Sequence, residues 1–304
     1  MTASRTAVSV AGRTLSLSNL DKVFYPQTGT TKAEVIDYYV RIAALLLPHI
    51  EDRPMTLKRY PDGVDAEFFY EKNCPSHGPE WVRRVRVDSG RSGTIDFCIV
   101  DDLPTLVWVA NLASIELHPY LHRATAPARP TMVVFDLDPG PPAGLFECVQ
   151  VALRLRDVLA QLDLKTVVKT SGSKGLQVYL PLNTPVSYEQ TTPFARAVAQ
   201  MLERENQAGV VSNMRKDLRR GKVLVDWSQN SEHKTTVGVY SLRARERPTV
   251  STPLKWEEVE AVSAGENPAS LMFEARDVLR RADEHGDLFA PAAELRQHLP
   301  DLRS

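Results

Sequence analysis

The chain has 304 residues, of which 43% are apolar and 25% charged, and its formal net charge is −1. This length allows one large domain or two small ones, and the composition is ordinary for a globular protein. The near-neutral charge excludes a globally basic nucleic-acid binder, so any basic site has to be local. No run approaches the ~18 apolar residues of a membrane helix, and the N-terminus lacks a signal-peptide pattern. We therefore expect a soluble, cytoplasmic protein with no membrane partner.

Three cysteines, Cys74, Cys98 and Cys148, are widely spaced and odd in number. This usage predicts a reducing compartment and no disulfide framework. Cys74 and His77 form a C-x-x-H pattern, but no second ligand pair with zinc spacing accompanies it. We therefore interpret the pattern as part of a loop rather than as a metal site.

The first helix is marked by a capping box, because Thr31 is followed three residues later by Glu34. Amphipathic periodicity then predicts a helix to about residue 50. Lys22 and Lys32 flank the turn before it, and Lys32 falls in the first helical turn, where a cation opposes the helix dipole. We expect Lys32 to face outward toward an anion, with a simple solvated lysine as the alternative.

The other elements follow from hydrophobic periodicity and turn residues. Strands are predicted over 13–18, 54–60, 67–72, 165–169, 176–180, 223–226 and 237–242, and a hairpin over 81–88 and 93–100 across the turn 89–92. Arginines 83, 84, 86 and 91 give this hairpin a basic face. Helices are predicted over 103–117, 146–162, 188–205 and most of the chain after residue 253. Strands outnumber helices in a mixed order, which favours an α+β fold with a largely antiparallel central sheet flanked by helices.

Phe68, Phe69 and Tyr70 stand in a row within the predicted strand 67–72. Three consecutive rings break strict alternation, so at least one of them has to face away from the core. An exposed ring beside cationic residues suits stacking on nucleic-acid bases. A contact with a protein partner or with the core remains the alternative.

The most informative stretch is F-D-L-D-P-G at 135–140, which follows the apolar run that begins at Met132. Asp136 and Asp138 lie two residues apart at the end of a buried strand, so their side chains share one face. Neighbouring carboxylates that leave water raise each other's pKa, and hard divalent cations relieve the repulsion. The stretch predicts a metal site, and a solvated acidic loop is the alternative.

Two further features belong with the acid pair. Asp226 closes another apolar strand, V-L-V-D, and is a candidate third ligand; the alternative is an acid paired with a neighbouring arginine. The turn S-G-S-K-G at 171–175 offers backbone N–H groups, hydroxyls and the Lys174 charge to a phosphate, although it is not a Walker A loop and also fits a plain hairpin turn.

Acids, a phosphate-binding turn and clustered arginines fit nucleotidyl transfer, in which two divalent ions activate a hydroxyl and stabilise the triphosphate. A two-metal nuclease has less need for a triphosphate-binding turn. A phosphatase with an aspartate nucleophile usually has Gly or Thr after its D-x-D near the N-terminus, whereas Pro139 follows here in mid-chain.

The motifs also resemble a known family, the polymerase domain of the bacterial ligase used in non-homologous end joining, within the archaeo-eukaryotic primase superfamily. The resemblance covers about Leu15 to Val250. Eight motifs appear in family order: D-K-V-F-Y-P (21–26), L-K-R-Y-P-D-G (57–63), E-F-F-Y-E-K (67–72), E-L-H-P (116–119), F-D-L-D-P-G (135–140), T-S-G-S-K-G-L (170–176), K-V-L-V-D-W-S-Q-N (222–230) and Y-S-L-R (240–243).

The resemblance assigns roles to residues of this chain. Two catalytic ions, Mn²⁺ or Mg²⁺, are implied at Asp136, Asp138 and Asp226. Contacts with the incoming NTP or dNTP are implied for Lys58, His118, Ser171, Lys174, Arg219 and Arg243. Contacts with DNA are implied for Lys22 and Lys32, which hold a 5′-phosphate, and for Phe68 and Phe69, which stack on the template.

The same resemblance implies a single primase-polymerase domain over 1–304, with an N-terminal subregion of about 1–125, a primase-like catalytic core of about 126–250 and a helical tail over 251–304. Its expected activity is template-dependent filling of short gaps at DNA breaks with a 5′-phosphate, with ribonucleotides preferred. No ligase or nuclease module follows in this sequence, so the expected partners are a separate DNA ligase and Ku. The alternative function is a non-catalytic binder of such DNA ends.

The sequence departs from the family at Gln177, where members commonly have His. A glutamine keeps hydrogen bonding but carries neither a proton nor a charge near neutral pH. Activity is expected to survive if that position only orients an acid or a phosphate, and to fall if it supplies charge.

Overall fold

The structure is a computed structural model that describes residues 5–88 and 93–300. Its larger sheet has six strands, and each neighbouring pair is antiparallel except β13 and β14. In spatial order the strands are β13 (Val210–Val211), β14 (Val223–Asp226), β10 (Met132–Pro139), β12 (Leu176–Pro181), β11 (Val167–Thr170) and β15 (Pro253–Leu254).

A second sheet of five antiparallel strands comes mainly from the N-terminal part of the chain. Its strands are β6 (Phe69–Glu71), β5 (Pro54–Arg59), β8 (Thr94–Ile99) and β7 (Arg84–Asp88), with β9 (Ser114–Pro119) also paired with β5. Two small hairpins precede it: β1 (Arg5–Val10) with β2 (Arg13–Ser18), and β3 (Val23–Tyr25) with β4 (Thr30–Thr31). The turn 89–92 of the predicted β7–β8 hairpin, with Arg91, lies outside the described residues.

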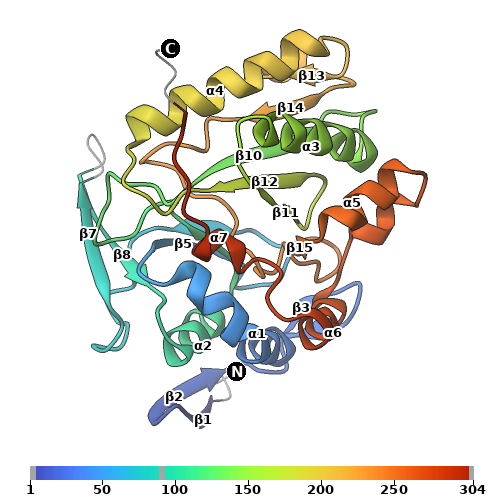
Figure 1. The fold of residues 1–304 in the computed structure, drawn as a ribbon. Coiled ribbons are helices and arrows are strands. Elements are labelled where there is room, and N and C mark those ends of the chain that lie inside the picture. The colour runs from blue at the N-terminus through green and yellow to red at the C-terminus, as the bar shows by residue number, and fades with distance from the viewer. Residues whose placement is uncertain (1–4, 89–92, 301–304) are drawn as a thin grey trace.

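Helices lie on both sides of these strands, with α3 and α4 at one end of the molecule and α1 and α2 at the other (Figure 1). The helices are α1 (Lys32–Ile50), α2 (Leu103–Asn111), α3 (Leu145–Ala160), α4 (Tyr188–Glu205), α5 (Trp256–Ser263), α6 (Ala275–His285) and α7 (Pro291–Glu294), with 3₁₀ turns η2 (Lys216–Leu218) and η3 (Pro268–Leu271). The predicted α+β class with a largely antiparallel central sheet is confirmed. In the described part of the chain, no helix is both long and apolar enough to cross a membrane.

The alternation of β10 decides where its acids point. Its odd-numbered residues from 133 to 137 are fully buried in the core formed with α3 and α4. Val134, on the even-numbered face, packs instead into the core that contains α1 and the second sheet. Because side chains alternate along a strand, Asp136 and Asp138 share the face of Val134. The two carboxylates therefore lie on the side of the six-stranded sheet that faces the rest of the molecule.

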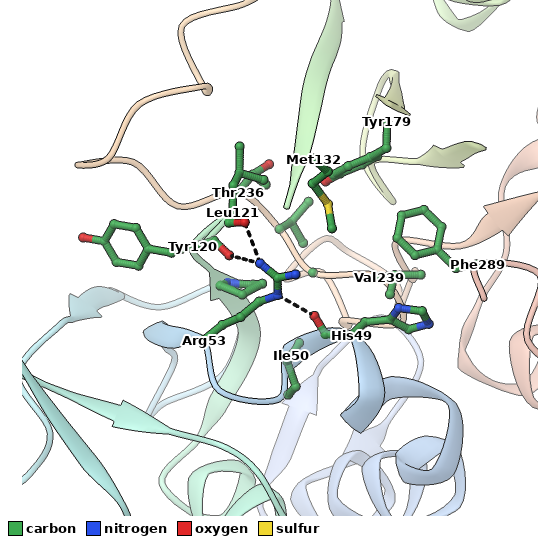
Figure 2. A pocket seen from close by; sticks show the side chains of 13 residues that line it. His49, Ile50, Arg53, Tyr120, Leu121, Met132, Tyr179, Thr236, Val239 and Phe289 are labelled. Atoms are coloured by element: carbon green, nitrogen blue, oxygen red, sulfur yellow. Dashed lines mark hydrogen bonds between the residues drawn. The ribbon is translucent and has the colours of Figure 1, made fainter. Parts of the chain in front are cut away.

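Arg53 stabilises the junction between the end of α1 and the segments that enter the two sheets (Figure 2). Its guanidinium donates to the carbonyls of His49 at 3.0 Å and Leu121 at 2.7 Å, and to the hydroxyl of Thr131 at 2.7 Å. Burial lowers the pKa of Arg53 to about 10. The cavity beside it, about 30 Å³, is lined mainly by apolar side chains, so we regard this feature as structural.

Two predicted elements are wrong. The helix predicted over 103–117 ends as α2 at Asn111, and Ala113 adopts a φ of 63°, after which the chain forms β9 against β5. The strand predicted over 237–242 is an irregular segment in which Tyr240 has a φ of 61° and Leu242 forms an isolated bridge with Val250. Both segments are short apolar runs, which periodicity alone cannot assign.

The expectation of no disulfide is also wrong, because Cys74 and Cys98 are bonded. The two residues are separated by 24 positions in the sequence, which gave no sign of their proximity. The backbone N–H of Cys74 donates to the carbonyl of Asp96 at 2.6 Å, so the loop before β7 lies against β8 and brings the sulfurs together. Cys148 is a free, buried thiol in α3.

Candidate active site

Four polar residues form a row across the six-stranded sheet. Asp136 on β10 is paired with Asp226 on β14 and, on its other side, with Gln177 on β12. Gln177 is in turn paired with Lys169 on β11. Direct cross-strand partners project from the same face, so the row places two acids, an amide and an amine side by side. Asp138 lies two residues further along the same face of β10.

The carboxylates of this row repel one another. Burial, together with the charges of Asp138 and Asp226, raises the pKa of Asp136 to about 7. Desolvation and the charge of Asp226 also raise the pKa of Asp138, whereas Arg219, Arg243 and Lys174 lower it. The ionised carboxylates are therefore disfavoured without nearby positive charge. A bound cation would relieve this repulsion.

Residues that directly follow β14 donate hydrogen bonds to the Asp226 carboxylate. Its Oδ1 accepts from the backbone N–H of Ser228 at 2.8 Å and from the hydroxyl of Ser228 at 2.6 Å, and its Oδ2 accepts from Gln229 at 2.9 Å. Among the described residues, no group of three or more His, Cys, Asp or Glu side chains is placed to hold a metal ion as they stand. The acids nevertheless fit a divalent ion in chemistry and position, with hard oxygen donors whose repulsion a cation would offset. Asp226, the direct cross-strand partner of Asp136, would be the third of these donors.

A cavity of about 540 Å³ opens in front of the acids. Five predicted site residues line it: His118, Asp136, Asp138, Ser171 and Arg243. The structure thus brings together residues from β9, β10, the loop after β11 and the segment after residue 240. Four other predicted residues do not line this cavity but lie near residues that do. The ammonium of Lys58 lies 5.6 Å from the ring centre of Tyr70, and the charges of Lys174, Arg219 and Asp226 shift the pKa of Asp138.

Glu116 links the cationic residues on the β5–β9 side of the cavity. Its Oε2 lies 2.8 Å from His118 Nε2 and 3.3 Å from Arg243 Nε, and its Oε1 lies 3.5 Å from Lys58 Nζ. Burial alone would raise the pKa of Glu116, but hydrogen bonding by His118 and the charges of Arg243 and Lys58 hold it at about 2. Burial lowers the pKa of His118 despite its contact with Glu116, so at neutral pH the imidazole is the neutral N–H donor of the group.

Lys58 also lies against aromatic rings. Its ammonium lies 4.1 Å from the ring centre of Phe68 and 5.2 Å from that of Tyr60. Burial and the nearby charge of Arg243 lower the pKa of Lys58, while Glu116 opposes this shift. The rings and the carboxylate together fix the amine at the edge of the cavity.

The turn 171–175 is ordered by its own side chains. The hydroxyl oxygen of Ser171 accepts from the backbone N–H groups of Ser173 and Gly175, both at 3.2 Å, which leaves its own proton available to a ligand. Arg243 donates to the carbonyl of Ser171 at 2.6 Å. A Cβ at Gly175 would overlap the carbonyl oxygen of Leu137, so glycine is required where this turn meets β10. Lys174, within the same turn, is exposed.

Arg219 approaches the acids from the loop before β14. Its guanidinium donates to the carbonyl of Met214 at 2.6 Å, and its charge lowers the pKa of Asp138. A Cβ at Gly140 would overlap the Arg219 carbonyl oxygen, which explains why glycine follows the acid pair and Pro139. The glycine allows the arginine loop to pack on the end of β10.

The expectation that Lys32 faces outward is wrong. Its side chain is buried, with 4% of its surface exposed, and its ammonium donates to the carbonyl of Ser18 at 2.6 Å. Burial and the charges of Lys22 and Arg59 lower the pKa of Lys32 to about 8. Lys22 is half-buried and donates to Asp62 at 2.5 Å. The two lysines therefore do lie close together, as the turn between them suggested, but only Lys22 is turned toward solvent.

Phe68 and Phe69 are both exposed, at 48% and 44% of their surface. The Phe69 ring lies 5.1 Å from the guanidinium carbon of Arg59. Tyr70 is exposed as well and lines the cavity, with its ring 6.2 Å from that of His118. All three consecutive rings thus face away from the core. Tyr70 lies at the acid-site cavity, and Phe69 lies against Arg59.

Several residues of the site were missed from the sequence. Glu116 was missed because the predicted helix 103–117 included it. In the observed strand, Glu116 and His118 lie on one face. Gln229 stands in the quoted D-W-S-Q-N motif and donates to Asp226. His233, Lys234 and Thr236 line the cavity from a loop that carries no distinctive pattern.

The chain was compared with known proteins. The family model described as LigD, primase-polymerase domain, matches residues 31–289. The multifunctional non-homologous end joining protein LigD of Mycolicibacterium smegmatis is 46% identical over 277 residues, which are 90% of this chain and 35% of that protein. The Bacillus subtilis bifunctional LigD is 31% identical over 81% of this chain and 40% of its own length. The chain therefore spans little more than a third of the length of these curated relatives.

A solved structure agrees with these matches. The polymerase domain from Mycobacterium tuberculosis Ligase D, in complex with DNA, superposes with a TM-score of 0.86 at 42% sequence identity, covering 93% of this chain and 99% of that one. Family model, relatives and structure therefore lead to one assignment. The chain belongs to the family of LigD primase-polymerase domains and, like them, is a DNA-directed nucleotidyltransferase.

Proposed function

We propose that the chain fills short gaps at DNA breaks by template-dependent transfer of nucleotides from NTPs or dNTPs, with a preference for ribonucleotides. One observation carries this proposal: Asp136 and Asp138 face the same 540 Å³ cavity as Ser171, His118 and Arg243. Acids for divalent ions and donors for a triphosphate are thus aimed into one space. A nuclease would need the acids but not the donors opposite them.

The residues divide the chemistry between them. Two divalent ions, Mn²⁺ or Mg²⁺, would be held by Asp136, Asp138 and Asp226, and would supply charge stabilisation of the phosphates and activation of the primer hydroxyl. Ser171 would donate its free hydroxyl proton to a phosphate oxygen. Arg243 would neutralise developing charge at the phosphates.

The remaining predicted residues would complete nucleotide binding. His118, neutral and hydrogen-bonded to Glu116, would contact the nucleotide from the cavity wall without carrying charge itself. Lys58, Lys174 and Arg219 lie around the cavity, where they would contact the outer phosphates. The charges of Lys174 and Arg219 lower the pKa of Asp138, and the charge of Lys58 lowers that of Glu116, which supports this proposal.

The DNA is proposed to approach across the exposed rings. Phe68 and Phe69 would stack on template bases beside the gap, and Lys22, with the buried Lys32 behind it, would hold the 5′-phosphate on the far side. The solved polymerase domain from Mycobacterium tuberculosis was described in complex with DNA, which supports a nucleic-acid partner for this fold. We also propose a separate DNA ligase and Ku as partners and the cytoplasm as the place of action, since the curated relatives are named for non-homologous end joining.

The test is incorporation on a gapped duplex of defined sequence. The protein is given a one-nucleotide gap with a 5′-phosphate, Mn²⁺ or Mg²⁺, and each NTP or dNTP in turn. We expect one templated addition, faster with NTPs than with dNTPs, and slower on the same gap with a 5′-hydroxyl. Binding of the 5′-phosphorylated gap without incorporation under either metal would instead support the alternative, a non-catalytic binder of DNA ends, for which Gln177 is the motivating departure.

A further inference from the structure

Lys169 is a fully buried lysine at the end of the polar row, with 0% of its surface exposed. Its ammonium has three acceptors: Gln177 Oε1 at 2.5 Å, Ser251 Oγ at 2.5 Å and the Val237 carbonyl at 3.2 Å. The Ser251 hydroxyl gives its own proton to the carbonyl of Thr170 at 2.9 Å, so its lone pairs are free to accept from the lysine. Burial lowers the pKa of Lys169 well below its usual range, and the charge of Asp136 opposes this shift. The protonated form carries three N–H groups, and each has an acceptor here.

This arrangement fixes the side-chain amide of Gln177. Its oxygen accepts from Lys169 and, at 3.2 Å, from the hydroxyl of Tyr179. The amide nitrogen therefore points the other way, where it donates to Thr236 Oγ1 at 3.1 Å. Asp136 is the direct cross-strand partner of Gln177, whose amide lowers the pKa of Asp136. A rotated amide would place its N–H₂ group against the ammonium and its oxygen against the Asp136 carboxylate. Both contacts would be repulsive, so the lysine allows only one orientation.

We infer that Lys169 is a positioning residue for nucleotidyl transfer, which holds the Gln177 amide with its N–H donors toward Asp136 and the cavity. This inference rests on the proposed function, because it assigns Lys169 a part in the reaction of the same site. Lys169 does not line the cavity. It contacts Gln177 directly, and its charge also lowers the pKa of Asp136.

The hydrogen bond from Lys169 gives the Gln177 amide a fixed orientation that a free amide would lack. An amide between an acid and a solvent-filled cavity can rotate, and half of its orientations present an acceptor to the acid. With its oxygen pinned, Gln177 is a directed donor, the hydrogen-bonding part of what an imidazole N–H provides at this position. Partners behind such a residue commonly change activity or metal affinity 10- to 100-fold when they are removed.

The experiment is a double-mutant cycle with Lys169→Met and Gln177→Met, with the exposed Lys165→Met as the matched control. For each variant, kcat and KM for the NTP are measured on the gapped duplex, Mn²⁺ affinity is measured by electron paramagnetic resonance without DNA or nucleotide, and folding is checked by thermal melting. We expect Lys169→Met to lower kcat about tenfold or more and to weaken Mn²⁺ binding several-fold, with KM changed much less. In the Gln177→Met background the same substitution should lower kcat much less, because the part of its effect that passes through the amide is already lost.

Lys169→Gln keeps the test decisive if Lys169→Met does not fold. A neutral amide at 169 can still donate to Gln177 Oε1, so kcat is expected to stay within about fivefold of the wild type. Equal losses from Lys169→Met in both backgrounds, unchanged Mn²⁺ affinity, or a Lys169→Gln variant that folds but loses activity would overturn the inference. If the wild-type protein incorporates no nucleotide, the proposed function fails, whereas the Mn²⁺ arm still decides whether Lys169 acts on the acids.

Discussion

Asp136 and Asp226 are direct partners on the antiparallel strands β10 and β14. Like charges directly opposite each other destabilise a sheet, and here the repulsion adds to burial at Asp136. The fold tolerates this because Asp226 accepts hydrogen bonds from Ser228 and Gln229, and because Gln177, the neighbour of Asp136 on β12, lowers its pKa. The protein can therefore fold with these two carboxylates side by side, although their mutual repulsion is not fully neutralised. This is the state expected of a site that binds cations.

The contacts of Glu116 with His118, Arg243 and Lys58 should make the protein less stable as the pH becomes acidic. A folded-state pKa of about 2, against 4.5 for the free side chain, means that Glu116 contributes stability above about pH 4.5 and loses this contribution as the pH falls toward 2. Between pH 5 and pH 3 the wild-type free energy of unfolding should fall by about 2 kcal/mol more than that of Glu116→Gln. Urea denaturation of both proteins at each pH measures the difference. Parallel pH profiles would show that Glu116 is not held ionised.

The buried amine of Lys32 should make recognition of a 5′-phosphate depend on alkaline pH. Its pKa of about 8 means that the ammonium is charged below pH 8 and becomes neutral above it. The preference for a 5′-phosphorylated gap over a 5′-hydroxyl gap should therefore decrease from pH 7 to pH 9. Lys32→Arg, which stays charged, should keep its preference over this range. Fluorescence anisotropy with the two duplexes measures both; a wild-type preference that does not change with pH argues against this role.

Phe69 should contribute to DNA binding by stacking. The ring is 44% exposed, so Phe69→Ala should leave thermal stability nearly unchanged. Loss of one stacked base is worth roughly 1–3 kcal/mol, so binding of a gapped duplex should weaken about tenfold. Leu162→Ala removes a similarly exposed apolar side chain, 44% exposed, after α3 and serves as the control. Equal effects of the two substitutions would remove Phe69 from the DNA interface.

The bond between Cys74 and Cys98 should be detectable chemically. Unfolded protein without reductant should react with one equivalent of a thiol reagent, at Cys148, and with three after reduction. Because the bond closes a 24-residue separation, its reduction should lower the free energy of unfolding by about 3 kcal/mol. Three reactive thiols before reduction would mean that the purified protein carries no such bond.

The parts of the fold that depend on local chemistry could be predicted from the sequence. The capping box forms as expected, with the Thr31 backbone N–H donating to Glu34 at 2.8 Å and the Glu34 backbone N–H donating to Thr31 at 3.3 Å. The buried strand that ends in Asp136 and Asp138 also forms, because its β-branched apolar run and the Pro139-Gly140 that follows favour a strand covered on both faces. Alternation along that strand was sufficient to place both acids on one face.

The parts that depend on distant contacts could not be predicted. The contact of Glu116 with Arg243 joins residues far apart in the sequence, and it forms only because Ala113 reverses the chain and turns a predicted helix into β9. Lys32 was expected in solvent because helix electrostatics disfavour it, yet the Ser18 carbonyl covers it. In each case tertiary packing outweighs a local preference.

The central claim is that Asp136 and its partners perform nucleotidyl transfer at a DNA gap. Its most direct measurement is single-nucleotide incorporation by Asp136→Asn, which keeps the size of the side chain and removes its charge. Asp157→Asn, an exposed acid on α3, is the matched control. We predict that Asp136→Asn binds the gapped duplex as tightly as the wild type and loses about a thousandfold or more in rate, whereas Asp157→Asn retains full activity. Incorporation by Asp136→Asn at a rate close to that of Asp157→Asn would contradict the account.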